Sequence, residues 1–302
     1  MKTILGAIVA LAVIILVGVG GYYYMQAQPQ SPTAPAPLAA TSTPQTATTT
    51  ASTAGGGTTV IGKSVQSRDI SAYHFGTGNK EILFVAGLHG SYGWNTTLVA
   101  YELIDYLTAH PEAVAANESV TVIPVVNPDG LYSGIGVEGR FKASDVTATL
   151  AATVPGRFNA NKVDLNRNFD CDWQAKGVWQ SKSVSGGTAA FSEPESKAVQ
   201  AYVQAHTPAA VVVWYSSAGG VYSSNCHGGV LPETAKITKV FADASGYSAH
   251  ASFDFYATTG DMVNWLAKMK IPAISVLLTN HTDTEWSKNQ AGVLALLKHY
   301  AQ

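Results

Sequence analysis

Asn166 and Arg167 lie in the segment Val163-Asp-Leu-Asn-Arg-Asn-Phe169, which holds the side chains best suited to anion binding. A guanidinium group can engage a carboxylate through two parallel hydrogen bonds. Arg167 also has a structural alternative, because Asp164 or Asp170 could pair with it in a local salt bridge. The segment therefore offers either carboxylate binding or a structural ion pair.

Alternating strand and helix patterns must position these residues. Apolar runs predict buried strands at residues 81–87, 119–126, 210–215 and 271–278. Periodic patterns predict helices at residues 95–109 and 285–300. Ser192 and Glu195 have capping-box spacing and predict a further helix ending near His206, while Asn127-Pro-Asp-Gly130 predicts a turn.

Strands that alternate with helices predict an α/β domain of three layers, with helices on both faces of a mostly parallel mixed sheet. Functional sites of such sheets gather at the carboxyl ends of strands. The loops after residues 87, 126, 215 and 278 are therefore the places where chemistry is expected.

Five segments resemble, in order and approximate spacing, the zinc carboxypeptidase (funnelin) family. They are residues 88–95, 127–130, 163–169, 214–220 and 256–265, and the resemblance spans residues 60–300. Its specific part is Asp-Leu-Asn-Arg-Asn-Phe with Asn-Pro-Asp-Gly upstream. The resemblance implies the carboxypeptidase fold, a zinc ion on two His and one Glu, and a second Glu as general base for removing C-terminal residues.

Most of the implied zinc site is missing. His89 matches the first ligand, although a single His after a strand can also be an ordinary polar residue. Gly93 stands at the position of the ligand Glu, Ser216 at that of the second His, and Leu277 at that of the general base. Neither Gly nor Leu can perform these roles, and a hydroxyl is a poor zinc ligand. We expect zinc binding to be weak or absent.

Other residues could rebuild a metal site only if three ligands converged at about 2.0 to 2.2 Å. His227 and His281 fall in segments near the expected site, and Asp283 and Glu285 follow His281. Loops rarely supply such convergence by accident, so a relocated site is not expected.

The substrate side of the resemblance is better preserved. Asn166 and Arg167 match residues that bind the terminal carboxylate, and Arg157 matches the Arg that stabilises the oxyanion. Tyr256 matches a mobile Tyr that closes over substrate, with ordinary aromatic packing as its alternative. Val263 implies an apolar side-chain pocket.

Cys171 and Cys226 are the two cysteines of the chain. In a domain outside the cytoplasm they predict a disulfide, worth about 2 to 4 kcal/mol. A zinc site of both cysteines with His227 is the alternative, and the adjacency of Cys226 and His227 makes its geometry awkward.

Residues 1–25 predict a transmembrane signal anchor, because residues 4–25 are uncharged and apolar and at ~1.5 Å per residue can cross a ~30 Å hydrocarbon core. A cleaved signal peptide, which would release a secreted protein, is the alternative. Lys2 on the short side predicts a domain outside the cytoplasm. Residues 26–58 read as a disordered Pro/Ala/Thr-rich linker, and residues 59–302 as one carboxypeptidase-like domain.

Two functions remain open. A formal net charge of -2 and a pI of about 6.4 argue against a nucleic-acid partner. The favoured hypothesis is a membrane-tethered, catalytically degenerate protein that binds peptide C-termini or cell-wall peptides. The alternative is an active zinc metallocarboxypeptidase with an atypical metal site.

Overall fold

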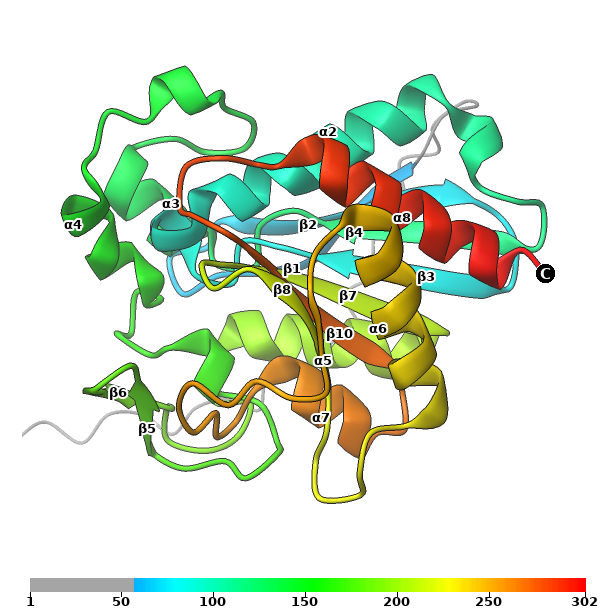
Figure 1. Cartoon of the computed structure of the whole chain (residues 1–302). Helices are drawn as coiled ribbons and strands as arrows, with labels where there is room; N and C mark the ends of the chain where they lie inside the picture. The colour runs from blue at the N-terminus through cyan, green and yellow to red at the C-terminus, as the bar shows by residue number, and fades with distance from the viewer. Residues whose placement is uncertain (1–56) are drawn as a thin grey trace, which may run out of the picture. The chain divides into compact units, whose positions relative to one another are not determined.

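The computed structural model describes residues 57–302, which fold around one eight-stranded sheet (Figure 1). The predicted anchor and all but the last two residues of the predicted linker lie outside the described residues. Within residues 57–302, no helix has the length and apolar character needed to span a membrane. The strands are β1 Gly57–Lys63, β2 Asp69–Gly76, β3 Lys80–Val85, β4 Glu118–Ile123, β7 Ala210–Ser216, β8 Gly220–Ser223, β9 Ala249–His250 and β10 Ala273–Leu278.

Parallel pairing dominates the centre of the sheet. The strand order is β1-β2-β4-β3-β7-β10-β8-β9, and β4, β3, β7 and β10 are mutually parallel. Antiparallel pairs flank them, with β1 and β2 on one side and β8 on the other. A separate hairpin joins β5 (Lys176–Trp179) to β6 (Lys182–Ser185). The expected mixed, mostly parallel sheet is confirmed.

Helices cover both faces of this sheet (Figure 1). One face packs against α2 (Trp94–Ala109), α6 (Pro232–Ser245) and α8 (Trp286–Tyr300). The other packs against α5 (Pro194–His206) and α7 (Met262–Lys268). The shorter helices are α3 Pro128–Ile135 and α4 Leu150–Thr153, with 3₁₀ turns η1 Gly90–Gly93, η2 Pro111–Ala113, η3 Ala143–Asp145, η4 Val154–Arg157 and η5 Leu165–Arg167.

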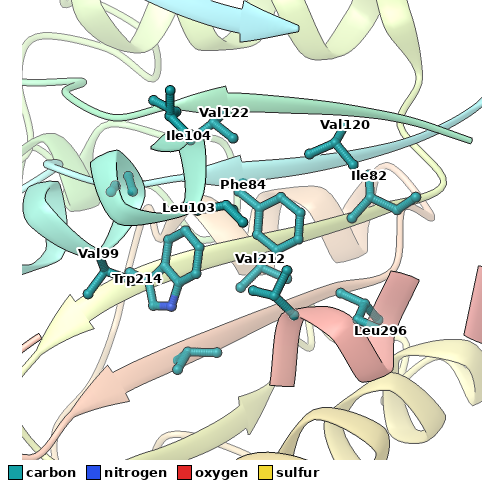
Figure 2. Packing of buried hydrophobic residues seen from close by; sticks show 14 of the residues in the cluster. Ile82, Phe84, Val99, Leu103, Ile104, Val120, Val122, Val212, Trp214 and Leu296 are labelled. Atoms are coloured by element: carbon teal, nitrogen blue, oxygen red, sulfur yellow. The ribbon is translucent and has the colours of Figure 1, made fainter. Parts of the chain in front are cut away.

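Alternation of side chains along each strand builds two apolar layers. In β3, Ile82 and Phe84 face the α2, α6 and α8 side, while Leu83 and Val85 face the α5 and α7 side. Figure 2 shows Phe84 against Trp214, whose rings stack with centroids 5.4 Å apart. Strands buried on both faces read as continuous apolar runs, which is why the sequence identified them.

Two local predictions were wrong in detail. Asn127-Pro-Asp-Gly130 is the first turn of α3, because the Asn127 carboxamide oxygen accepts the Gly130 N–H at 2.9 Å. The Ser192 capping box does not form either. Helix α5 has Glu193 as its N-cap residue, and the Glu193 N–H donates to the Asn168 side chain at 3.1 Å.

Candidate functional site

A cleft of about 580 Å³ opens at the carboxyl ends of β7 and β10 and beside the loop that follows β3. This location agrees with the rule for sheets of this type. The loop after β4 does not line it; the Asn127 side chain instead donates to the carbonyl of Gly156 at 3.4 Å. Nine residues singled out in the sequence line the cleft: His89, Arg157, Asn166, Arg167, Ser216, Tyr256, Val263, Leu277 and His281. Gly93 does not line it.

The Asn166 side chain is held by three hydrogen bonds. Its carboxamide oxygen accepts the Tyr215 hydroxyl at 3.0 Å and the Met262 N–H at 3.1 Å. Its nitrogen donates to Asp261 at 2.8 Å. Asp261 also caps α7, because its other carboxylate oxygen accepts the Asn264 N–H at 3.0 Å, and burial raises the pKa of this carboxyl above its ordinary value of 3.8. Asn166 is thus fixed between β7 and the start of α7.

Arg167 is a buried cation that the protein surrounds with neutral acceptors. Its guanidinium donates to the carbonyl of Val178 at 2.7 and 3.1 Å and to the carbonyl of Asn166 at 2.7 Å. The residue is 1% exposed, and no carboxylate of residues 57–302 lies within 4.0 Å of its guanidinium. Gly177 makes room for it, since a Cβ at that position would come within 2.8 Å of the Arg167 Cδ. The alternative of an ion pair with Asp164 or Asp170 does not describe this side chain.

Arg157, unlike Arg167, is paired with a carboxylate, that of Asp164. It donates to Asp164 Oδ2 from Nε at 3.0 Å and from Nη2 at 2.8 Å, and its guanidinium lies 4.4 Å from the centre of the Trp179 ring. Burial alone would raise the pKa of Asp164, but the Arg157 and Arg167 guanidiniums outweigh it and lower that pKa. Asp164 is therefore ionised and neutralises Arg157.

His89 lies beside this pair as a neutral imidazole. Burial, reinforced by the charge of Arg157, lowers the pKa of His89 well below its ordinary value. Its Nε2 is 3.8 Å from Asp164 Oδ1 and has no hydrogen-bond partner among the described residues. The imidazole packs against the Tyr215 ring at 5.4 Å between centroids. The cleft thus contains a buried polar atom, His89 Nε2, that forms no hydrogen bond with the described residues.

The residues around His89 do not fit the zinc ion that a carboxypeptidase-like site would hold. Among residues 57–302, no three His, Cys, Asp or Glu side chains converge on a point where a metal could sit. Ser216 is turned to Asn95, to which its hydroxyl donates at 2.7 Å. Leu277 lies next to Tyr215 in the β7–β10 register and presents only hydrocarbon. Position 93 has space, because a Cβ on Gly93 would meet no atom closer than 3.5 Å.

The two cysteines form the expected disulfide. Cys171 and Cys226 are bonded, with their Cα atoms 6.1 Å apart. His227 pairs instead with Asp172 at 2.6 Å on the surface, so the alternative of a Cys₂His zinc site is wrong. His281 lines the cleft, and its ring nitrogen lies 3.0 Å from the carbonyl of Tyr92.

Aromatic side chains also line the cleft. Tyr256 packs edge-on against Phe253 at 5.1 Å and lies 5.8 Å from the Arg167 guanidinium. Trp179, from the β5–β6 hairpin, meets Tyr92 edge-on at 5.1 Å. The sequence singled out Tyr256 and missed the others.

Tyr215, Asp261 and Trp179 are among the cleft residues with contacts to Asn166 or Arg157 that sequence reasoning missed. Tyr215 sits at the end of a predicted strand, which is a usable signal for a site in this type of sheet. Asp261 is preceded by Gly260 and followed by an apolar helix, the pattern of an N-cap residue. Trp179 lies in a short hairpin, which no periodic pattern in the sequence predicts.

The fold and the cleft define a mixed α/β protein whose site lies at the carboxyl ends of its central strands. The family model described as zinc carboxypeptidase matches residues 57–276, so the chain belongs to the zinc carboxypeptidase family. The resemblance drawn from the five sequence segments is confirmed.

Relatives with known names share part of this chain. Bacteriocin BCN5 of Clostridium perfringens is 26% identical over 231 residues, covering 74% of this chain and 23% of the bacteriocin. Carboxypeptidase B of Helicoverpa zea is 28% identical over 154 residues, covering 48% of this chain and 34% of that protein. The chain thus spans well under half the length of these two relatives.

Solved structures share the fold. The murein-tripeptide amidase MpaA from Escherichia coli O157 superposes with a TM-score of 0.58 at 20% identity, over 82% of this chain and 92% of that one. Thrombin activatable fibrinolysis inhibitor gives a TM-score of 0.64 at 17% identity, over 82% and 69% of the two chains. At these identities the likeness establishes the fold alone.

Proposed function

We propose that this protein binds the C-terminal carboxylate of a peptide through Arg167 and Asn166 and does not hydrolyse it. The observation that carries the proposal is the buried, cleft-lining guanidinium of Arg167, which has only carbonyl partners. A buried charge is costly unless it is paired. A ligand carboxylate would supply the direct ion-pair partner that Arg167 lacks, whereas Arg157 is already paired with Asp164.

The ligand class follows from the rest of the cleft. Val263 and Leu277 contribute apolar surface, and Tyr256 stands at the rim close to Arg167. The murein-tripeptide amidase, whose fold is shared, is named for a cell-wall peptide, so stem peptides of the cell wall are candidates beside other peptide C-termini. Residues 4–25 would tether the domain to the membrane, facing an oxidising compartment compatible with the Cys171–Cys226 disulfide.

We propose that hydrolysis is absent because the side chains that it requires are replaced in this chain. Family chemistry requires a metal ion and a general base, and Gly93, Ser216 and Leu277 replace the side chains that would supply them. Arg157 matches the Arg that stabilises the oxyanion in the family, but its guanidinium is paired with Asp164. The competing function, a working metallocarboxypeptidase, rests on one observation, the open Nε2 of His89.

Titration of the full-length chain with a peptide and with its C-terminal amide tests the binding proposal. We expect the free acid to bind at least about 10-fold more tightly, because a hydrogen bond to a charged group contributes roughly 1.5 to 3 kcal/mol. Arg167→Gln should abolish the preference, whereas Arg140→Gln, which removes an arginine paired with Asp105 outside the cleft, should leave it unchanged. Equal affinities of the wild type for acid and amide would refute the carboxylate site.

Zinc content and release of C-terminal amino acids, measured on the same preparation, decide between the two functions. We expect neither bound zinc nor release of amino acids in the wild type. A variant with Gly93→Glu, Ser216→His and Leu277→Glu should gain zinc if the roles are assigned correctly. Stoichiometric zinc and hydrolysis in the unaltered chain would establish the active alternative.

A further inference from the structure

Asn166 has one hydrogen-bonding valence left for a ligand, and its direction is fixed by the protein. A carboxamide offers two acceptor lone pairs and two N–H donors. Tyr215 and Met262 occupy both lone pairs, and Asp261 takes one N–H. The remaining valence is therefore an N–H on a side chain that lines the cleft.

Asp261 and the Met262 N–H determine that orientation, and the Tyr215 hydroxyl helps to hold the carboxamide in place. The Met262 N–H can only donate, and the Asp261 carboxylate can only accept. Turning the carboxamide over would place its nitrogen against the Met262 N–H and its oxygen against the Asp261 carboxylate. Both contacts would be repulsive, so the network fixes a donor toward the cleft.

We infer that Tyr215 and Asp261 are positioning residues that make the cleft select a carboxylate over a carboxamide. Arg167 has only donors, and an Asn166 held in this orientation adds another beside it in the chain. A carboxylate accepts from every donor, while the NH₂ group of a carboxamide would face a donor without a partner. This inference rests on the proposed function, because it explains how the same site recognises its ligand.

The ratio of the dissociation constants of a peptide amide and of the matching free acid tests it. Tyr215→Phe keeps the ring that packs on His89 and removes only the hydroxyl. Asp261→Asn keeps the size of the side chain and a residue type that caps helices well. Tyr215→Phe should lower the ratio about 3- to 10-fold, the range expected for one hydrogen bond. Asp261→Asn should lower it by less, because it also removes a negative charge that opposes an acid at Arg167.

Tyr222→Phe is the matched control, because Tyr222 also lines the cleft but its hydroxyl donates to the carbonyl of Gly219 at 2.8 Å. Its ratio should equal that of the wild type. A merely structural role of Tyr215 and Asp261 would weaken both peptides equally and leave the ratio unchanged, which would overturn the inference. A wild type without any preference for the acid would instead defeat the proposed function itself. If Tyr215→Phe fails to fold, Asp261→Asn alone decides.

Discussion

Asp164 controls the charge of the cleft. It is fully buried, stays ionised because two guanidiniums lower its pKa, and accepts two hydrogen bonds from Arg157 on Oδ2. Arg167, whose hydrogen bonds go to carbonyls alone, is then the arginine of the cleft without a carboxylate within 4.0 Å among residues 57–302. A cleft with two unpaired arginines would favour doubly charged anions, whereas this one matches a single carboxylate.

His74, which does not line the cleft, gives a prediction about the pH dependence of stability. Its ring nitrogens lie 2.8 Å from the Thr59 hydroxyl and 3.1 Å from the Thr121 hydroxyl, and burial lowers its pKa. The unfolded chain therefore takes up this proton at higher pH than the folded chain does. The stability due to neutral His74 is complete above about pH 6.5 and is lost as the pH falls through the lower folded pKa.

We expect the free energy of unfolding to decrease from pH 7.5 to pH 5 less steeply in His74→Gln than in the wild type. The difference in slope is at most that of one proton, about 1.4 kcal/mol per pH unit. Urea titrations at several pH values measure it. His227→Gln, at a side chain that is 74% exposed, is the control, and equal slopes for His74→Gln and the wild type would contradict the argument.

The sequence identified Asn166 and Arg167 as candidate site residues, but it did not show which hydrogen bonds they form. The sequence places Asp164 seven residues from Arg157 and three from Arg167, and nothing in that spacing shows which arginine it binds. Tyr215 and Asp261 were missed for a related reason. Their contact with Asn166 joins residues 49 and 95 positions apart, which only the folded chain brings together.

At the scale of elements, Asn168 joins the motif segment to helix α5. Its carboxamide oxygen accepts the Glu193 N–H and the Ser196 hydroxyl, and its nitrogen donates to the carbonyls of Gly186 and Ala189 at 2.6 and 2.9 Å. The Ser192–Glu195 spacing predicted this helix, but not the cap that forms. The capping group lies 25 residues upstream of Glu193, outside any local pattern.

Asn168→Ala should lower the free energy of unfolding by about 2 to 4 kcal/mol, because it removes the cap and leaves several buried polar groups without partners. Urea unfolding with an unchanged m-value measures the loss. Asn117→Ala, which removes a single 3.5 Å contact near the surface, should change stability by less than about 0.5 kcal/mol. Losses of similar size in the two variants would show that Asn168 does not cap α5.

At the scale of the whole molecule, the apolar runs predicted the central strands within a few residues. The outer strands β1, β2, β8 and β9 were not predicted, because they are partly exposed or very short and carry no long apolar run. Strand order was not predictable either. It depends on which strands pair across long stretches of chain, such as β3 with β7.

The Cys171–Cys226 disulfide closes a loop of 55 residues across this fold. Chain entropy predicts a stabilisation of about 4 kcal/mol, and native strain commonly reduces it to about 2 to 4. The variant with Cys171→Ala and Cys226→Ala should lose that amount in denaturant unfolding. A reducing agent should destabilise the wild type to the same level and leave the variant unaffected; an effect on the variant would point to another cause.

The burial of Arg167 also determines how the protein would respond to ionic strength. Mobile ions screen exposed charges over about 8 Å at 0.15 M salt, but they screen a buried pair far less. The whole chain carries a formal net charge of only -2, so no strong field gathers or repels an anionic ligand from a distance. Binding should therefore be nearly as tight in a salty medium as in a dilute one, with an association rate set by diffusion into the cleft.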